Sequence, residues 1–264
     1  MNKIKKHCKL IELDPPGTIL LKRAFLEMIK NLQAKTFIEV GCGDGKFSKV
    51  LLNKGLTGYG VDFSKDALRK AAQSNQKSIN EGKYQLVNAN IMGAELPENV
   101  DMVCSFMTME HVENDMEFLM KMKKITKPNG AIVMAVPARM DKWGVEDESA
   151  GHYRRYDREA LKNAFEKVGL SNIKIWSVAV PTSNILLGLS NKVIKTATAQ
   201  GGTKMSQEEK TKESGIMDIP YKTLFPSYYK LILNRITMMP LCLLQKLFYN
   251  SDRGVVLLIS ATNI

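Results

Sequence analysis

Short apolar runs alternate with longer amphipathic segments through most of this chain. An apolar run bounded by turn residues indicates a buried strand, and apolar residues at helical spacing indicate a helix. Strands are expected at 36–40, 58–63, 84–87, 100–106, 131–136, 172–180 and 254–262. Helices are expected at 19–32, from residue 46 onward, and at 65–80, 114–126 and 157–168. Such alternation builds a sheet covered on both faces. The sequence therefore predicts an α/β fold of the doubly wound, Rossmann-like type with a mostly parallel seven-stranded sheet.

The stretch between the last two expected strands is too long for an ordinary loop. It shows two helical parts around a polar hinge, A-Q-G-G-T-K-M-S-Q-E-E-K-T-K-E-S-G. We therefore divide the chain into an N-terminal helical and basic segment (1–35), a core (36–180), a helical insert (181–253) and the final strand of the core sheet (254–264). The insert is expected to be either a lid over a binding site or an assembly surface, and a homodimer is one such assembly.

The charge balance limits the class of partner. The chain of 264 residues carries a formal charge of +11, which favours acidic partners such as nucleic acid, anionic lipid headgroups, or phosphorylated and carboxylated metabolites. The surplus is spread along the sequence, so nucleic acid is disfavoured. The apolar stretch from Leu231 is interrupted by Asn234, Arg235 and Pro240 and does not predict a transmembrane helix, but a membrane surface stays an open partner.

The cysteines and the N-terminal residues indicate the compartment. The four cysteines form no C-x-x-C pair, so neither a disulfide framework nor a zinc site is expected, and we expect no bound metal. The N-terminal lysines are followed by Glu12, Asp14 and a Pro-Pro-Gly turn instead of an apolar run, which argues against a signal peptide. A cytoplasmic location is expected.

Three glycines follow the first core strand in F-I-E-V-G-C-G-D-G-K-F, at Gly41, Gly43 and Gly45. A strand, a tight glycine turn and a helix N-terminus together present backbone N–H groups to a ligand. The dinucleotide pattern G-x-G-x-x-G would place its third glycine at Lys46, one residue later than here. The compact form suits a ligand that passes close to the turn without two phosphates, and a purely structural tight turn is the alternative.

The next two strands end in side chains that suit a nucleoside. Asp62 lies about twenty residues after the first glycine, where a carboxylate can accept both hydroxyls of a ribose. Phe63 can lie along an adenine face, and the amide of Asn90 can meet the adenine edge. For Asp62, a helix cap for the segment from Ser64 is the alternative.

Five motifs in order carry a family resemblance. E-V-G-C-G-D-G, G-V-D-F, N-A-N-I, F-M-T-M-E-H-V and K-P-N-G-A-I-V-M-A-V-P together resemble the class I S-adenosylmethionine-dependent methyltransferases, from about residue 36 to 180. The resemblance implies S-adenosyl-L-methionine as cofactor. The family more often has Asp at the position of Asn90, so this contact is a weaker match than that of Asp62.

The resemblance also implies a set of cofactor-binding residues. The position of Glu39 and the glycine turn would hold the methionine part, Asp62 the ribose and Asn90 the adenine. Cys42, like Cys104, is also expected to be a small core or strand-end residue. The full set comprises Glu39, Gly41, Cys42, Gly43, Gly45, Asp62, Phe63, Asn90, Ile91 and Met107.

Two of the three histidines follow core strands and are the candidate catalytic residues. His111 follows the fourth strand, and His152 follows the fifth, so both belong at the carboxyl edge of the sheet beside the expected methyl donor. Methyl transfer is an in-line displacement that depends mainly on positioning, although a hydroxyl acceptor gains from a base. We expect His152 to be a base or a substrate contact. His111 is a second candidate, and packing of the cofactor loop is its alternative.

The segment G-H-Y-R-R-Y looks like one found in a small-molecule branch of these enzymes. It supplies the candidate substrate-binding residues Tyr153, Arg154, Arg155 and Tyr156. Two adjacent guanidiniums suit a bidentate grip on a carboxylate or phosphate. The alternative is that they form ion pairs with the acidic loop 146–149.

The expected function is methylation of a small molecule. O-methylation of an anionic or partly apolar metabolite or natural-product intermediate is favoured because a histidine is available. Nucleic-acid amino methyltransferases often carry Asn or Asp before Pro-Pro and an aromatic residue at the position where this chain has S-F-M-T. A nucleic-acid substrate is therefore less favoured. Two alternatives stay open: a peripheral membrane methyltransferase of a lipid or quinone-like substrate, and a non-catalytic protein that binds S-adenosylmethionine.

Overall fold

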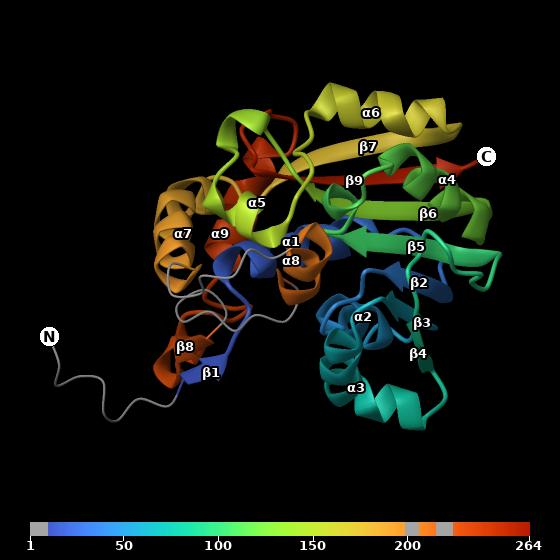
Figure 1. Cartoon of the computed structure of the whole chain (residues 1–264), viewed down its shortest axis with the longest axis horizontal. Coiled ribbons are helices and arrows are strands. Elements are labelled where there is room, and N and C mark those ends of the chain that lie inside the picture. The colour runs from blue at the N-terminus through green and yellow to red at the C-terminus, as the bar shows by residue number, and fades with distance from the viewer. Residues whose placement is uncertain (1–9, 199–205, 215–223) are drawn as a thin grey trace, which may run out of the picture.

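A seven-stranded sheet forms the centre of the protein. The computed structural model describes residues 10–198, 206–214 and 224–264 (Figure 1). The strands are β2 (Thr36–Val40), β3 (Thr57–Asp62), β4 (Tyr84–Asn88), β5 (Val100–Phe106), β6 (Thr126–Pro137), β7 (Leu170–Val178) and β9 (Val256–Asn263). They lie in the order β4-β3-β2-β5-β6-β9-β7, and only β9 runs antiparallel to its neighbours. The predicted mostly parallel, doubly wound sheet is confirmed.

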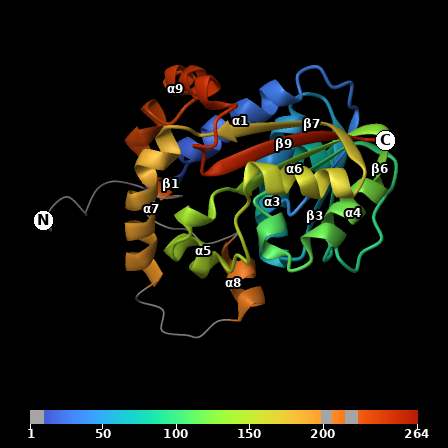
Figure 2. The ribbon, with the colours of Figure 1, turned by 90° about the horizontal axis from the view of Figure 1, so that it is seen from above.

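Helices cover both faces of this sheet because successive strand residues point to opposite sides. In β2, Phe37 packs with α1 (Pro16–Met28) and α2 (Lys46–Leu52), whereas Ile38 packs with α4 (Asp115–Ile125) and α6 (Arg158–Lys167). Figure 2 shows α1 and α4 on opposite sides of the sheet. The remaining helices are α3 (Lys65–Asn80), α5 (Val145–Ala150), α7 (Thr182–Thr198), α8 (Gln207–Ser214) and α9 (Met239–Leu244), with 3-10 turns η2 (Met109–His111), η3 (Met140–Lys142), η4 (Ser227–Leu231) and η5 (Gln245–Phe248).

The strand order reverses between β2 and β5. The chain runs outward from β2 through β3 to β4, and then returns to β5 on the other side of β2. Ligands of open parallel sheets bind outside the carboxyl ends of the strands at such a switch point. The glycine turn follows β2 and the F-M-T-M-E-H segment follows β5, so both stand at this point. Helices α5, α7 and α8 lie along the same edge (Figure 1).

Four local elements differ from the sequence prediction. Strand β1 (Leu10–Glu12) pairs antiparallel with β8 (Leu224–Pro226), whereas the sequence placed both in helical segments. Strands of three residues are too short to show a period, which is why they were not detected. Helix α5 is likewise too short for a helical pattern. The expected polar hinge contains α8, and its residues 199–205 and 215 lie outside the described residues.

The insert is only in part described. It contributes α7, α8, β8, α9 and the turns η4 and η5 to the structure. Among the residues that the structure describes, no helix has both the length and the apolar character needed to cross a bilayer.

Candidate active site

The three glycines after β2 all adopt positive φ, at 69° for Gly41, 52° for Gly43 and 72° for Gly45. Residues other than glycine rarely take this backbone conformation. A Cβ on Gly41 would overlap the side chain of Thr108, and one on Gly45 would overlap Asn75. A Cβ on Gly43 would meet no atom within 4 Å. The outer two glycines are therefore required by neighbouring side chains, whereas the middle one faces open space, where a ligand can approach.

Asp62 ties this turn to the end of β3. One carboxylate oxygen accepts the N–H of Gly43 at 2.9 Å, and the other accepts the N–H of Ser64 at 2.8 Å. Burial raises the pKa of Asp62, although its backbone hydrogen bonds oppose the rise. The cap of α3 is Ser64, whose side chain accepts from Ala67 at 3.3 Å. Asp62 thus shapes the turn, and its remaining lone pairs can still accept hydroxyl donors.

The predicted adenine contacts lie around the end of β4. Asn90 is exposed, and its side-chain oxygen accepts the N–H of Met92 at 3.0 Å. Its amide NH₂ has no partner among the described residues, so donation to an adenine ring nitrogen is open to it. Ile91 is buried and Phe63 is half-buried. Met107, at the end of β5, has a φ of 53° and is 37% exposed.

Glu39 lies inside the protein and not on an open surface. Its side chain is buried, and it accepts a hydrogen bond from the hydroxyl of Ser48, which in turn accepts from Tyr84 at 2.7 Å. Burial raises the pKa of Glu39 to about 8. Cys42 and Cys104 are both buried, as expected for small core residues.

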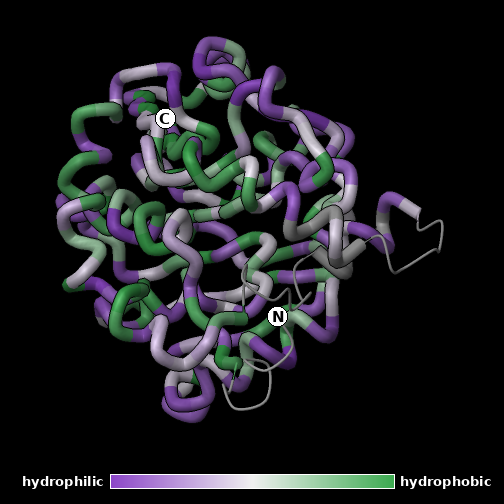
Figure 3. The backbone as a smooth tube through the Cα atoms, turned by 90° about the vertical axis from the view of Figure 1, so that its left-hand side faces the viewer, coloured by the Kyte–Doolittle hydropathy of each residue, from purple (hydrophilic) through white to green (hydrophobic). Residues whose placement is uncertain are grey.

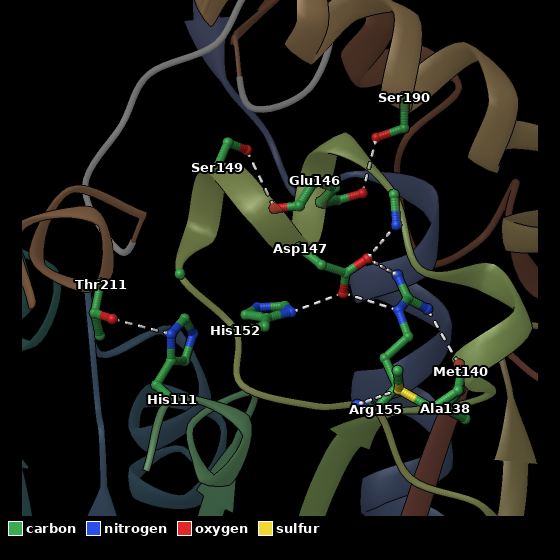
Figure 4. A network of polar contacts seen from close by, with 12 residues as sticks. His111, Ala138, Met140, Glu146, Asp147, Ser149, His152, Arg155, Ser190 and Thr211 are labelled. Atoms are coloured by element: carbon green, nitrogen blue, oxygen red, sulfur yellow. Dashed lines mark hydrogen bonds and ion pairs between the residues drawn. The ribbon is translucent and has the colours of Figure 1, made fainter. Parts of the chain in front are cut away.

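The two candidate histidines meet at the carboxyl edge. His111 ends η2 after β5, and His152 follows α5. Their ring centroids are 4.6 Å apart and the rings stand edge to face at 83° (Figure 4). Gly151 makes this possible because its left-handed conformation ends α5 and turns the chain back toward the helix. The hydroxyl of Thr211 in α8 lies 3.3 Å from Nδ1 of His111, so part of the insert reaches the site.

Asp147 of the acidic loop fixes the orientation of His152, a contact that sequence position alone does not predict. Its buried carboxylate contacts Nδ1 of His152 at 2.8 Å and also accepts two N–H groups of Arg155, at 2.8 and 2.9 Å (Figure 4). Burial alone would raise the pKa of Asp147, but the hydrogen bonds from His152 and Arg155 outweigh it and lower the pKa to about 2. An ionised acceptor at Nδ1 favours the tautomer whose Nε2 is unprotonated and can accept a proton.

The arginines of G-H-Y-R-R-Y already bind groups of the protein. Arg155 is 8% exposed and holds Asp147 and the Ala138 carbonyl, so it matches the alternative of an ion pair with the acidic loop. Arg154 pairs with Asp115 at 2.7 Å, outside that loop.

The tyrosines of this segment differ in exposure. Tyr156 is buried, and its hydroxyl lies 3.3 Å from the Asp115 carboxylate, whereas Tyr153 is 41% exposed. In this structure Arg155 is therefore not available as an anion clamp, because its guanidinium is buried and engaged. Tyr153 and Arg154 are the members of the segment with accessible surface.

Glu110 is a buried carboxyl group beside the histidines. It is 0% exposed, and neither of its oxygens has a hydrogen-bond partner among the described residues. Burial raises the pKa of Glu110 to about 8 and lowers that of His111 to about 3. One ligand atom each from Glu110, His111 and His152 lies within 4.8 Å of the others. Carboxylate and imidazole donors of this kind suit a divalent cation. The spacing of the cysteines gives no information on such a site, because none of its donors is a cysteine.

Part of the chain is similar to curated methyltransferases. The chain is 28% identical over 106 residues to the mitochondrial ubiquinone biosynthesis O-methyltransferase of Schizosaccharomyces pombe, an alignment that covers 40% of this chain and 39% of that protein. The same enzyme of Pseudomonas fluorescens SBW25 is 28% identical over 112 residues, 42% of this chain and 48% of its own length. The chain thus spans less than half the length of these curated relatives.

Solved structures share the fold at low identity. Phosphoethanolamine N-methyltransferase 2 of Haemonchus contortus superposes with a TM-score of 0.58 at 15% identity, covering 92% of this chain and 52% of that one. The [4+2]-cyclase SpnF superposes with a TM-score of 0.59 at 12% identity, covering 97% and 88%. A family model described as a methyltransferase domain matches residues 19–175, which is more than half of the sequence. The chain belongs to the methyltransferase-domain family.

Proposed function

We propose that the chain transfers a methyl group from S-adenosyl-L-methionine to a hydroxyl oxygen of a small molecule, with His152 as the general base. The observation that carries this proposal is the buried Asp147 bonded to His152 Nδ1 at 2.8 Å, on the edge of the sheet where β2 and β5 end. An imidazole held in this way matches the base of an oriented acid–base pair.

The residues of the glycine turn fit the cofactor. Gly43 leaves open space for an amino-acid tail, Asp62 has acceptor capacity for a ribose diol, and Asn90 offers an amide to an adenine edge. When bound, the cofactor supplies an electrophilic methyl group. The protein aligns the acceptor oxygen with that methyl group, and Nε2 of His152 takes the hydroxyl proton. The contact of α8 with His111 would help to keep water from the reacting atoms.

We further propose a phenolic, quinone-like or partly apolar acceptor. The names of the curated relatives support this class. Exposed Tyr153 and the neighbouring Arg154 are the groups that would meet an aromatic or anionic acceptor at the rim. The lid role of the insert is supported by Thr211 of α8 at His111. A homodimer and a cytoplasmic location stay predictions.

The direct test is transfer of an isotope-labelled methyl group from S-adenosyl-L-methionine into a panel of phenols, catechols and amines. Methylation of a hydroxyl acceptor supports the proposal. Binding of the cofactor without transfer to any acceptor would favour the non-catalytic alternative, and transfer to amines alone would remove the need for His152 as a base. Repeating the assay after treatment with a chelator separates a base role of His152 from a role of Glu110, His111 and His152 as metal ligands.

The substitution Asp62→Ala is expected to weaken cofactor binding about a hundredfold or more. It removes the acceptor for the ribose and also the anchor that holds the Gly43 N–H. Calorimetric titration with S-adenosylmethionine and with its demethylated product measures the effect. The matched control is Asp66→Ala, because Asp66 is an exposed aspartate at the start of α3. Equal affinities of the wild type and the Asp62 variant would refute the assignment.

The substitutions Gly43→Ala and Gly45→Ala are expected to act on different properties. Both place a side chain at positive φ, at a cost of about 1–2 kcal/mol. Gly45→Ala also overlaps Asn75 and should lose more stability, whereas Gly43→Ala fills only open space and should mainly weaken cofactor binding, about tenfold. Thermal unfolding and calorimetry of each variant separate the two effects. Undiminished cofactor affinity in Gly43→Ala would show that the ligand does not pass this glycine.

A further inference from the structure

The segment from η4 to η5 is apolar on both of its sides. Its inner side chains recur at helical spacing, and Met238, Cys242, Gln245 and Tyr249 are all buried. Other side chains of the segment are exposed. This outer apolar face consists of Leu231, Ile232, Ile236, Met239, Leu243 and Leu247, with exposed fractions of 76, 56, 83, 38, 55 and 81%.

The inner side fixes this segment firmly to the core. The side-chain amide of Gln245 donates to the Leu20 carbonyl at 3.1 Å, and its oxygen accepts the N–H of Ala179 at 3.0 Å. Tyr249 stacks on Trp176 with ring centroids 4.1 Å apart. The exposed side chains therefore belong to an anchored element, and their exposure is a property of the fold.

Single exposed apolar side chains are normal on a protein surface, but six of them within residues 231–247 are not scattered singly. Large contiguous apolar patches on a protein surface mark contacts with proteins or membranes. Figure 3 colours the backbone by hydropathy, and hydrophobic and hydrophilic stretches alternate along it. The outer apolar face is therefore a candidate contact surface.

The charges around this face identify the partner. The sequence has no Asp or Glu from residue 224 to 251. Lys230 and Arg235 are exposed and form no ion pair with any residue that the structure describes. On the neighbouring α1, Arg23 is exposed as well, and the carboxylate of Glu27 is held by Lys246 at 2.8 Å. The segment that carries the face is therefore apolar and cationic, and it contains no acidic residue.

We propose that the outer apolar face docks the protein on an anionic lipid bilayer. Leucine and isoleucine side chains would enter the boundary between headgroups and acyl chains, and Lys230 and Arg235 would meet the headgroup phosphates. A second copy of this chain fits less well. A symmetric contact would bring the same cations of both copies toward one another, and residues 224–251 supply no carboxylate to pair with them.

The test is sedimentation of the full chain with vesicles. Wild-type protein is expected to bind vesicles of phosphatidylcholine with phosphatidylglycerol, to bind pure phosphatidylcholine vesicles much more weakly, and to lose affinity as salt is raised. Leu247→Ser and Ile236→Ser should each lower the affinity about tenfold, because each removes a side chain that would be buried in lipid. Lys230→Glu combined with Arg235→Glu should abolish the preference for anionic vesicles.

Met120→Ser is the matched control, since Met120 is 53% exposed on α4, on the opposite side of the sheet from α1 and α9 (Figure 2). Its vesicle affinity should equal that of the wild type. All of these positions are exposed, so the variants are expected to keep the wild-type melting temperature and cofactor affinity. Absence of vesicle binding by the wild type, or equal losses in Met120→Ser and Leu247→Ser, overturns the proposal. Light scattering that shows a dimer dissociated by Leu247→Ser, without vesicle binding, assigns the face to a second copy instead.

Discussion

Replacement of His152 by glutamine is expected to lower kcat for a hydroxyl acceptor about 10²- to 10⁴-fold, the usual contribution of a positioned base. The affinity for S-adenosylmethionine should change little, because His152 lies after α5 and not in the glycine turn. Rates under saturating cofactor, together with calorimetric cofactor titration, check both statements.

The acidity of the acceptor gives this prediction a sharper form. A phenol that is already ionised needs no base, so His152→Gln should cost much less with an acidic phenol than with a weakly acidic one. His111→Gln serves as the comparison, since His111 is expected to have a smaller effect on this dependence. An unchanged kcat in His152→Gln, or an equal loss for every acceptor, would show that His152 does not remove the proton.

The substitution Asp147→Asn is expected to cost about 3–5 kcal/mol of folding stability. It leaves the buried guanidinium of Arg155 without its carboxylate, which is the most expensive way to break a buried ion pair. Urea unfolding measures the loss. Asp141→Asn is the control, because Asp141 makes exposed pairs with Arg139 and Lys142 that are worth little. A double variant that also carries Arg155→Met should recover part of the stability.

The same carboxylate predicts an acid dependence. The folded-state pKa of Asp147 is lowered from 3.8 to about 2, so its contribution is present above the unfolded-state value and is lost as the pH falls from about 4 to 2. Asp147→Asn should remove this part of the acid unfolding. Asp147 is also a positioning residue for His152, so the variant should change the pH profile of kcat. An altered stability with an unchanged profile would leave Asp147 a structural role only.

The alternation of strands and helices was sufficient to predict the sheet. All seven core strands were located from short apolar runs, because strands of a parallel sheet are buried on both faces and show little else. The glycine turn was also recognisable, since three positive-φ positions in five residues leave a clear mark in the sequence. The spacing of the glycines does not show why each one is needed. That reason depends on Thr108 and Asn75, which come from distant segments.

The acid–base site was predictable only in part. The positions of His111 and His152 after neighbouring strands indicated that they belong to one edge. The contact of His152 with Asp147 instead depends on how the loop before it turns at Gly151, and the sequence offered only an acidic run. For the same reason the sequence favours Arg155 as a substrate contact over an ion pair with the acidic loop, whereas the structure gives it that buried ion pair.

The place of β9 has a consequence for how the chain is made. This strand lies between β6 and β7 and pairs with both, yet it is synthesised after the whole segment 181–253. Synthesis proceeds from the N-terminus, so until β9 leaves the ribosome β6 and β7 each carry a bare hydrogen-bonding edge. Nascent chains stalled before residue 256 should therefore recruit chaperones and aggregate, whereas chains stalled with β9 released should not.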